Sequence, residues 1–448
     1  MVLHIRLAEI IKALSHALDL TEGQLPGHCV RCCHIGMAIG QTIGLSETML
    51  HDLYYTLMLK DLGCSSNAAR ICELYVSDDL TFKRDYKLVD GSVPQMLRFL
   101  LSHAGEQTNL AARMRVLLGV MKHGSKNSVE LIQTRCERGA EIARQMRFSD
   151  NVAQGIRDLD EHFDGGGLPT HINGGTIHIF ARITLLAQVA DVFFQAGGAD
   201  AAIHEVQNRS GSWFDPAVVK VFLQVAGNDS FWQELASSDL EQIVLNTEPG
   251  QHAIMADEDY LDDIAAGFAR VIDAKSPYTS GHSDRVALYT DLIAEQMQID
   301  TATRRKLKRG ALLHDIGKLG ISNTVLDKPG KLDDEEWLLM KRHPEFSHNI
   351  LSRIRAFADL AVIGGAHHER LDGKGYPLGL KGSEINLETR IVSTADVFDA
   401  LTADRPYRPA MPVRKALDIL WEGANTSHDP ECINALEQAL AKADLLAA

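Results

Sequence analysis

The chain of 448 residues contains an internal repeat, which restricts it to folds that can be built twice. Two pairs of segments match: 27–40 (GHCVRCCHIGMAIG) with 281–294 (GHSDRVALYTDLIA), and 57–71 (LMLKDLGCSSNAARI) with 311–325 (ALLHDIGKLGISNTV). Their spacing is also the same, because 33 residues separate His28 from Asp61 and His282 from Asp315. A tandem duplication of this size predicts two domains of one fold.

The duplication continues toward the end of each copy. Two later pairs match: 159–169 (LDEHFDGGGLP) with 367–377 (HHERLDGKGYP), and 190–193 with 395–398 (ADVF in both). The copies differ in the middle, since 75 residues separate Asp61 from Cys136 whereas 28 separate Asp315 from His343. We therefore expect an insertion in the first copy, near residues 75–125.

The connection between the copies has the composition of a linker. The stretch 236–258 is acidic and contains Pro249 and Gly250, which interrupt regular structure. We predict that the domains are 1–252 and 253–448.

Helical periodicity dominates the pattern of apolar residues. In segment 260–274 they recur at helical spacing, at Leu261, Ile264, Phe268, Val271 and Ile272. The following segment repeats this pattern at Val286, Tyr289, Ile293 and Met297. Strand signals are limited to short stretches such as TIHIF near residue 178. We therefore predict an all-α fold with two tandem helical domains.

Composition and charge exclude several classes of protein. The chain is 45% hydrophobic, and we find no apolar run of the roughly 20 residues that a transmembrane helix needs. Glu9 and Lys12 interrupt the N-terminal segment, which is not typical of a secretion signal, so we expect a cytoplasmic protein with no membrane partner.

Seven cysteines, an odd number, favour reduced thiols over a disulfide framework. The formal net charge of −15 argues against binding to long nucleic acid.

The second copy carries a set of potential metal ligands that includes two adjacent pairs. The set is His282, His314, Asp315, His343, His367, His368 and Asp396. Imidazole and carboxylate groups suit first-row transition metals, and a carboxylate can bridge two ions about 4 Å apart. Isolated histidines such as His348 and His428 are better explained as ordinary core or surface residues. The set predicts a binuclear centre for phosphodiester hydrolysis.

Three motifs together resemble the HD-GYP family of bacterial phosphodiesterases over residues 257–440. They are HDIGK (314–318), HHERLDGKGYP (367–377) and ADVFDALTADRPYR (395–408). The resemblance implies two HD-like domains and two divalent ions, most often iron, manganese or nickel. It assigns His282, His314, Asp315 and Asp396 to one ion and Asp315, His343, His367 and His368 to the other. Some members have a glutamate for a third ion where this chain has Tyr278, so we expect two ions.

The resemblance also implies the residues that act on the substrate. Asp315 bridges the ions and, with Lys318, is expected to be catalytic. The residues expected to contact the substrate are Lys318, Gly373, Tyr376, Arg405 and Arg408. Gly373 and Gly375 are able to adopt positive φ in the loop before Pro377. Arginine and lysine are physically suited to phosphate recognition.

The family's usual substrate, cyclic di-GMP, is our main expectation, with pGpG or GMP as the product. An alternative is a phosphodiesterase specific for 3'3'-cyclic GMP-AMP. An alternative of another class is a nucleotide sensor or protein-interaction module without activity, and a third is an HD-type hydrolase of nucleoside phosphates. The expected partner is the cyclic dinucleotide, with a homodimer or a diguanylate-cyclase-type protein as further possibilities.

The first copy has lost most of these ligands. Aligned with the second copy, it has Lys60 for His314, Cys64 for Lys318, Cys136 for His343, and Leu159–Asp160 for His367–His368. Only His28, Asp61 and Asp191 remain, so we interpret this copy as a degenerate, regulatory or dimerising HD-like domain. An alternative is a metal or redox site built from His28, Cys29, Cys32, Cys33 and His34. The preferred interpretation is that these cysteines are small apolar residues on a helix.

Overall fold

A computed structural model of the chain describes residues 5–106, 108–250, 254–404 and 408–443. The chain divides into two compact units, Met1–Tyr260 and Leu261–Ala448. Within the described residues, the β-strands are β1 (Ile5–Arg6) and β2 (Met255–Ala256), which pair antiparallel with Ile5 opposite Ala256. All other regular elements are helical, so the prediction of an all-α fold is confirmed.

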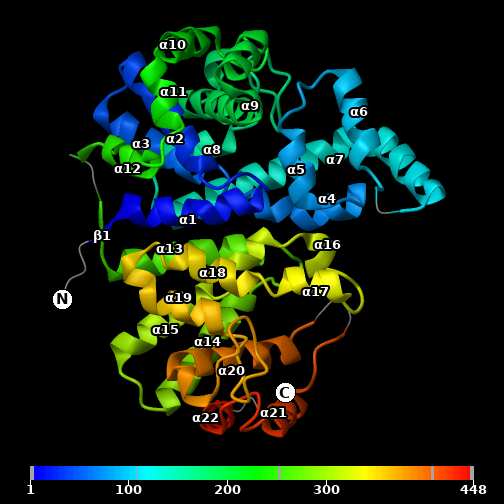
Figure 1. Cartoon of the computed structure of the whole chain (residues 1–448), viewed down its shortest axis with the longest axis vertical. Helices are drawn as coiled ribbons and strands as arrows, with labels where there is room; N and C mark the ends of the chain where they lie inside the picture. Colours follow the sequence, from blue (N-terminus) through cyan, green and yellow to red (C-terminus); the bar gives the residue numbers. More distant parts are fainter. Residues whose placement is uncertain (1–4, 107, 251–253, 405–407, 444–448) are drawn as a thin grey trace. The chain divides into compact units, whose positions relative to one another are not determined.

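The first unit contains the helices of the first copy (Figure 1). In chain order they are α1 (Leu7–Thr21), α2 (His28–Ile43), α3 (Glu47–Leu59), η1 (Cys64–Asn67), α4 (Ala68–Tyr75), α5 (Asp79–Tyr86), α6 (Val93–His103), α7 (Leu110–Gln145), α8 (Asp150–Arg157), η2 (Gly174–Thr176), α9 (Ile179–Asn208), α10 (Pro216–Ala226), α11 (Asp229–Leu235) and α12 (Leu240–Thr247).

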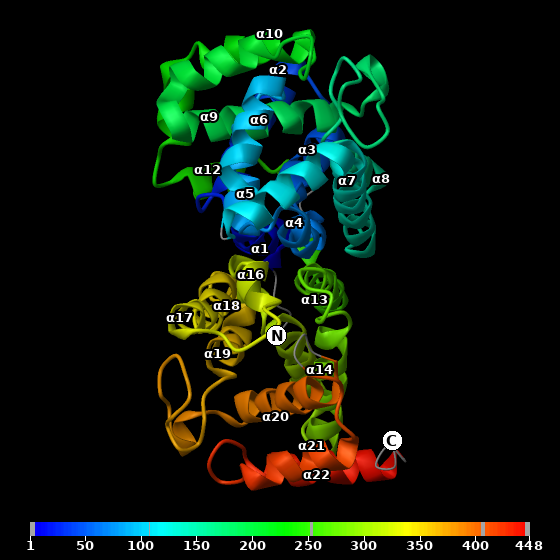
Figure 2. The same cartoon turned by 90° about the vertical axis from the view of Figure 1, so that its right-hand side faces the viewer.

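The second unit contains the helices of the second copy, which Figure 2 shows from the side. Its helices are α13 (Glu258–Asp273), which begins at the division, α14 (His282–Gln296), α15 (Thr301–Leu313), η4 (Ile316–Gly320), α16 (Asn323–Leu326), α17 (Asp334–Met340), α18 (His343–Leu351), η5 (Arg355–Phe357), α19 (Ala358–Ala366), η6 (Gly382–Glu384), α20 (Leu387–Thr402), α21 (Val413–Glu422) and α22 (Pro430–Lys442).

Equivalent helices in the two copies begin for the same local reasons. Gly27 and Gly281 precede α2 and α14 with φ of 86° and 66°, a conformation that favours glycine. Ser46 caps α3 by accepting from Met49 N at 3.3 Å, and Asp300 caps α15 by accepting from the first-turn amides. The repeat in sequence is therefore a repeat in helix boundaries.

The core of the second unit lies between α14, α15, α20 and the two C-terminal helices. Its fully buried members include Val286, Ile293, Ile391, Leu417 and Leu436. Tyr289 packs against this core with its ring edge-on to Phe398, 4.9 Å between centroids. This packing fixes α14 against α20, which matters because both helices carry a predicted metal ligand.

Two elements differ from the expectations drawn from sequence. TIHIF near residue 178 is not a strand: Gly174–Thr176 forms η2, and α9 begins at Ile179. His178 caps α9, because its Nδ1 accepts from Phe180 N at 3.3 Å. One helix, α9, is also long and apolar enough to span a membrane, but 67% of its apolar window is buried inside the unit and Gly198 interrupts its helical geometry.

Candidate metal centre

Five elements bring the predicted metal ligands together in the second unit. His282 and His343 are the first residues of α14 and α18, while His314 and Asp315 lie between α15 and η4. The pair His367–His368 follows α19, and Asp396 is inside α20. All except His368 are buried, and His368 is partly buried. Residues up to 114 positions apart in the sequence therefore converge in the interior of one helical unit.

The orientation of four imidazole rings is fixed by hydrogen bonds on the Nδ1 side. His314, His343 and His367 donate from Nδ1 to the carbonyl oxygens of residues three positions earlier, over 2.6, 2.7 and 2.9 Å. His282 Nδ1 lies 2.7 Å from Asp399 Oδ2. Since Nδ1 carries the proton, Nε2 of each neutral ring keeps its lone pair for a metal ion.

Asp315 lies between two groups of these Nε2 atoms. Its Oδ2 is 3.6 Å from His282 Nε2 and 3.3 Å from His314 Nε2. Its Oδ1 is 3.4 Å from His343 Nε2 and 3.5 Å from His367 Nε2. The two oxygens of one carboxylate thus face two separate groups of nitrogens, which is the arrangement of a bridging ligand.

Asp396 joins the first of these groups. Its Oδ1 lies 3.4 Å from His282 Nε2 and 3.7 Å from His314 Nε2. The first group therefore consists of two imidazoles and two carboxylates.

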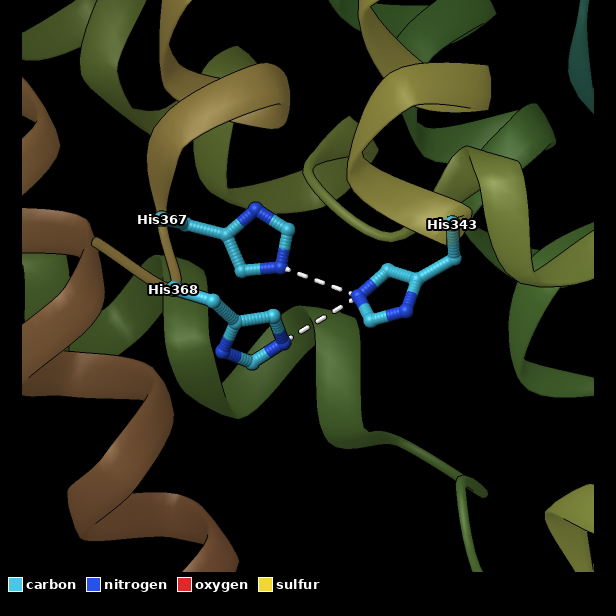
Figure 3. A group of neighbouring side chains, drawn as sticks. All are labelled: His343, His367 and His368. Atoms are coloured by element: carbon cyan, nitrogen blue, oxygen red, sulfur yellow. Dashed lines mark hydrogen bonds between the residues drawn. The ribbon is translucent and has the colours of Figure 1, made fainter. Parts of the chain in front are cut away.

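The second group is a trio of histidines (Figure 3). His343 Nε2 lies 3.3 Å from His367 Nε2 and 3.1 Å from His368 Nε2. Because Nδ1 of both His343 and His367 faces a carbonyl oxygen, their Nε2 lone pairs point at each other in the neutral state. Burial lowers the pKa of His343 to about 3, so this ring is neutral. Facing lone pairs at this distance call for a cation between them.

In the first group the imidazoles are protonated rather than neutral, and this group also indicates a site for a cation. Burial opposes a positive charge on His282, yet Asp315, Asp396 and Asp399 raise its pKa to about 10. Burial likewise opposes a charge on His314, and Asp315 and Asp396 raise its pKa to about 9. Among the described residues, the buried atoms His282 Nε2, His314 Nε2 and Asp315 Oδ1 have no hydrogen-bond partner. These donor sets fit two divalent ions.

Two of the predicted substrate-contacting residues lie against the centre. Lys318, in η4, forms an ion pair with Asp315 Oδ2, and its side chain is partly exposed. The Tyr376 ring stacks on His368, with 4.8 Å between centroids and 29° between planes. Burial and the charges of Asp315 and Asp396 raise the pKa of Tyr376, so its hydroxyl stays protonated.

The loop that carries Tyr376 is held by a buried carboxylate. Glu369 accepts from the backbone amides of Leu378, Gly379 and Leu380 over 2.6 to 3.1 Å. Gly373 has φ of 74°, as its glycine suggested. At Gly375 a side chain is excluded by lack of space, because a Cβ there would lie 2.5 Å from the backbone of Glu369 and Arg370.

The remaining predicted contacts are not part of this cluster. Arg408 donates to the carbonyl oxygens of Ala400, Leu401 and Pro409 over 2.8 to 3.0 Å. Arg405 lies outside the described residues. Tyr278 is 37% exposed, before α14. The substrate-binding roles of Arg405 and Arg408 stay predictions.

The sequence analysis missed the residues that orient the ligands. Asp399 accepts from His282 Nδ1 and also binds Arg285, whose Nε lies 2.5 Å from Asp399 Oδ1. Ser347 accepts from Gly317 N at 2.9 Å and so ties η4 to α18. The only signal for Asp399 was its place one helical turn after Asp396, which is weak on its own.

In the first copy, three carboxylates are paired with basic side chains that are buried or partly buried. Lys60 is fully buried and forms an ion pair with Asp61. Lys87 Nζ lies 2.8 Å from Glu22 Oε2, and Arg135 pairs with Asp160. Lys60 aligns with His314, and Asp160 aligns with His368. At these positions the first copy therefore has carboxylates paired with basic side chains, whereas the second copy has imidazoles.

Asp191 also differs from its aligned partner Asp396. Its two oxygens lie 2.6 Å from His28 Nδ1 and 2.6 Å from Arg31 Nε. These are the contacts that Asp399 makes in the second copy, so Asp191 has the contacts of Asp399 although it aligns with Asp396.

The short run of histidines and cysteines in α2 does not form one site. Cys32 Sγ lies 3.7 Å from His28 Nδ1, while Cys33 Sγ faces the carbonyl oxygen of Tyr54 at 3.9 Å. His34 stacks on Phe231, 5.3 Å between centroids. Burial raises the pKa of Cys29, Cys32 and Cys33, which keeps them as inert thiols. The pattern reflects a buried helix.

Comparisons with known proteins agree with this geometry. A family model described as HD domain matches residues 118–218 and 267–432. The 3'3'-cGAMP-specific phosphodiesterase 3 of Vibrio cholerae serotype O1 is 53% identical over 434 residues, covering 97% of this chain and 94% of that protein. The cyclic di-GMP phosphodiesterase response regulator RpfG of Xanthomonas campestris pv. campestris is 39% identical over 203 residues, covering 45% of this chain and 54% of that protein.

A solved structure shares the fold over the whole chain. It is described as the crystal structure of a cyclic GMP-AMP-specific phosphodiesterase of V. cholerae (V-cGAP3), with a TM-score of 0.67, 46% identity and coverage of 98% of each chain. The chain therefore belongs to the HD domain family, in its HD-GYP group, and carries two tandem copies of the fold of which the first is degenerate.

Proposed function

We propose that this protein is a metal-dependent phosphodiesterase that hydrolyses 3'3'-cyclic GMP-AMP. The observation that carries the choice of substrate is the 53% identity, over 94% of its length, to a relative named for that specificity. The relative named for cyclic di-GMP matches only 45% of this chain. Cyclic di-GMP, our main expectation from the sequence, is therefore the less supported substrate.

The geometry of the second unit supports hydrolysis rather than binding alone. His282, His314 and Asp396 with Oδ2 of Asp315 would hold one ion, and the three remaining histidines with Oδ1 of Asp315 would hold the other. When bound, two such ions would neutralise the phosphate oxygens and lower the pKa of a water that they share. Iron, manganese and nickel suit these ligands.

Two side chains of the chain itself support binding of the phosphate. Lys318 provides a positive charge beside Asp315 and is partly exposed, which suits contact with a phosphate oxygen. Tyr376 keeps its hydroxyl protonated and available as a donor close to His368. Both features are consistent with the substrate contacts that the family resemblance implies for Lys318 and Tyr376.

The test is hydrolysis by the full chain after reconstitution with Mn²⁺ or Fe²⁺. Chromatography would follow 3'3'-cyclic GMP-AMP, its other isomers and cyclic di-GMP in parallel, with Asp315→Ala as the control. We expect preferential loss of 3'3'-cyclic GMP-AMP to linear or mononucleotide products, absent in the control. Faster turnover of cyclic di-GMP would restore the first expectation. Binding without turnover under both metals would favour the sensor.

A further inference from the structure

An exposed aromatic ring continues the row of rings that starts at the metal centre. Tyr376 stacks on His368, and Trp337 on α17 meets Tyr376 edge-on, with 5.8 Å between centroids and 73° between planes. Trp337 is 42% exposed, although tryptophan is among the costliest side chains to leave in water. The row runs from a metal ligand to a solvent-accessible indole.

A lysine lies beside both outer rings. Lys341 Nζ is 5.4 Å from the centroid of Trp337 and 5.6 Å from that of Tyr376. In the part of the chain that the structure describes, Lys341 has no carboxylate within ion-pair distance, so its charge is not compensated there by an acidic side chain. An aromatic face with an adjacent cation is the combination that binds nucleotides in single-stranded form.

The helix that carries Trp337 is attached to the metal centre and not to the core. No residue of α17 is buried. Its start is fixed by a reciprocal cap between Asp333 and Glu336, and Lys328 pairs with Glu336. At its other end, the carbonyl oxygen of Met340 accepts from His343 Nδ1 at 2.7 Å. Because packing does not explain Trp337, its position beside the centre points to a ligand.

We infer that Trp337 stacks on one nucleobase of the bound cyclic dinucleotide and that Lys341 contributes positive charge to the same subsite. This inference rests on the proposed function and adds a contact that the family motifs do not include. Stacking of a base on an aromatic side chain accounts for roughly a 10- to 100-fold difference in affinity. Trp337 is thus a residue that determines affinity for the substrate, and it takes no part in the chemical step.

The test compares Trp337→Ala, Trp337→Phe and the neighbouring exposed Leu338→Ala in the metal-loaded full chain. For 3'3'-cyclic GMP-AMP we expect Trp337→Ala to raise KM about 10- to 100-fold and to change kcat less than about 3-fold. Trp337→Phe should recover most of the loss, and Leu338→Ala should match the wild type.

A second readout separates stacking from a structural effect. Titration of GMP or AMP into the metal-loaded protein should quench tryptophan fluorescence in the wild type and not in Trp337→Phe. If the wild type cleaves the cyclic dinucleotide but Trp337→Ala has an unchanged KM, the inference is wrong and the proposed function stands. If the wild type cleaves no cyclic dinucleotide, the proposed function fails and this inference fails with it.

Discussion

The charge on Asp399 holds His282 in the orientation that a metal ion requires. Asp399→Asn keeps the shape of the side chain but removes the charge that faces His282 Nδ1 and Arg285. Loss of such an orienting carboxylate weakens metal affinity about 10- to 100-fold. Calorimetric titration of the apoprotein with Mn²⁺ should therefore show one weakened site and one unchanged site.

The matched control for this variant is Asp291→Asn on α14, the helix that begins at His282. Asp291 pairs with Arg304 at 2.8 Å. It lies in the same helix as His282 but more than two helical turns after it. Its metal titration should equal that of the wild type. Wild-type affinity in a folded Asp399→Asn protein would show that His282 needs no such partner.

The buried ion pair between Lys60 and Asp61 in the first copy can be tested by its effect on stability. Lys60 and Asp61 are both fully buried, and the charge of Asp61 raises the pKa of Lys60 against the effect of burial. Lys60→Met leaves Asp61 as a buried charge without its nearest partner, which should lower the free energy of unfolding by about 3–5 kcal/mol. Guanidinium unfolding followed by circular dichroism measures this change.

The double variant Lys60→Met/Asp61→Asn removes both charges and should recover most of that stability. If the single variant were as stable as the wild type, the ion pair would not be what compensates Asp61.

Residue types and spacing predicted much of the site but not the direction of each side chain. Adjacent pairs such as His314–Asp315 are hard to explain by packing, and the seven predicted ligands do converge. The contacts of Asp191 and Asp399 were not predicted, because the rotation of a helix decides which side of an imidazole a carboxylate meets. Motif spacing alone does not give the rotation of a helix about its axis.

At the scale of elements, one glycine in each copy, in or next to a 3₁₀ turn, allows the backbone to touch a helix later in the same copy. A Cβ at Gly317 would lie 2.0 Å from the carbonyl oxygen of His343, and one at Gly63 would lie 1.8 Å from that of Arg135. Gly317→Ala should therefore displace η4 from α18, the helix that His343 begins. We expect a loss of about 1–3 kcal/mol in stability together with weaker binding of Mn²⁺.

Gly63→Ala is the matched variant, because it introduces the same clash into the first copy. It should destabilise the protein to a similar degree and leave Mn²⁺ titration unchanged. Equal metal affinity in Gly317→Ala and the wild type would contradict the coupling between η4 and the histidine trio.

Helix positions were predictable where apolar periodicity is long, and short segments were not. The predicted helix over 260–274 corresponds to α13, because five apolar residues on one face outweigh local ambiguity. TIHIF was read as strand because five residues cannot distinguish alternation from the start of a helix. The capping contact between His178 and Phe180 N is local, but it depends on the side-chain conformation of His178 and not on the pattern of apolar residues.

At the scale of the whole molecule, the duplication preserved a fold and not a site. Both copies keep a glycine before α2 or α14 and a carboxylate on His28 or His282. The first copy has Lys60 where the second has His314, so Asp61 is compensated by a side-chain cation without an ion. The substrate could not be predicted from the metal-ligand motif, because its residues are the same whether the expected substrate is cyclic di-GMP or 3'3'-cyclic GMP-AMP.

The two copies should therefore respond differently to metal in the intact chain. If Mn²⁺ is present at about 100 times its dissociation constant, binding stabilises the bound region by about 2.7 kcal/mol. Amides that exchange only when the site opens should then exchange about 100-fold more slowly. Hydrogen–deuterium exchange with mass spectrometry should show this protection in η4, α18 and α19, which contain or directly adjoin predicted ligands.

The equivalent peptides of the first copy provide the control within one molecule. Exchange in η1 and α8 should not change with Mn²⁺, because Lys60 and Arg135 already compensate Asp61 and Asp160. Metal-dependent protection of η1 would mean that an ion displaces Lys60 from Asp61. The first copy would then be a second metal-binding domain, and its description as degenerate would have to be abandoned.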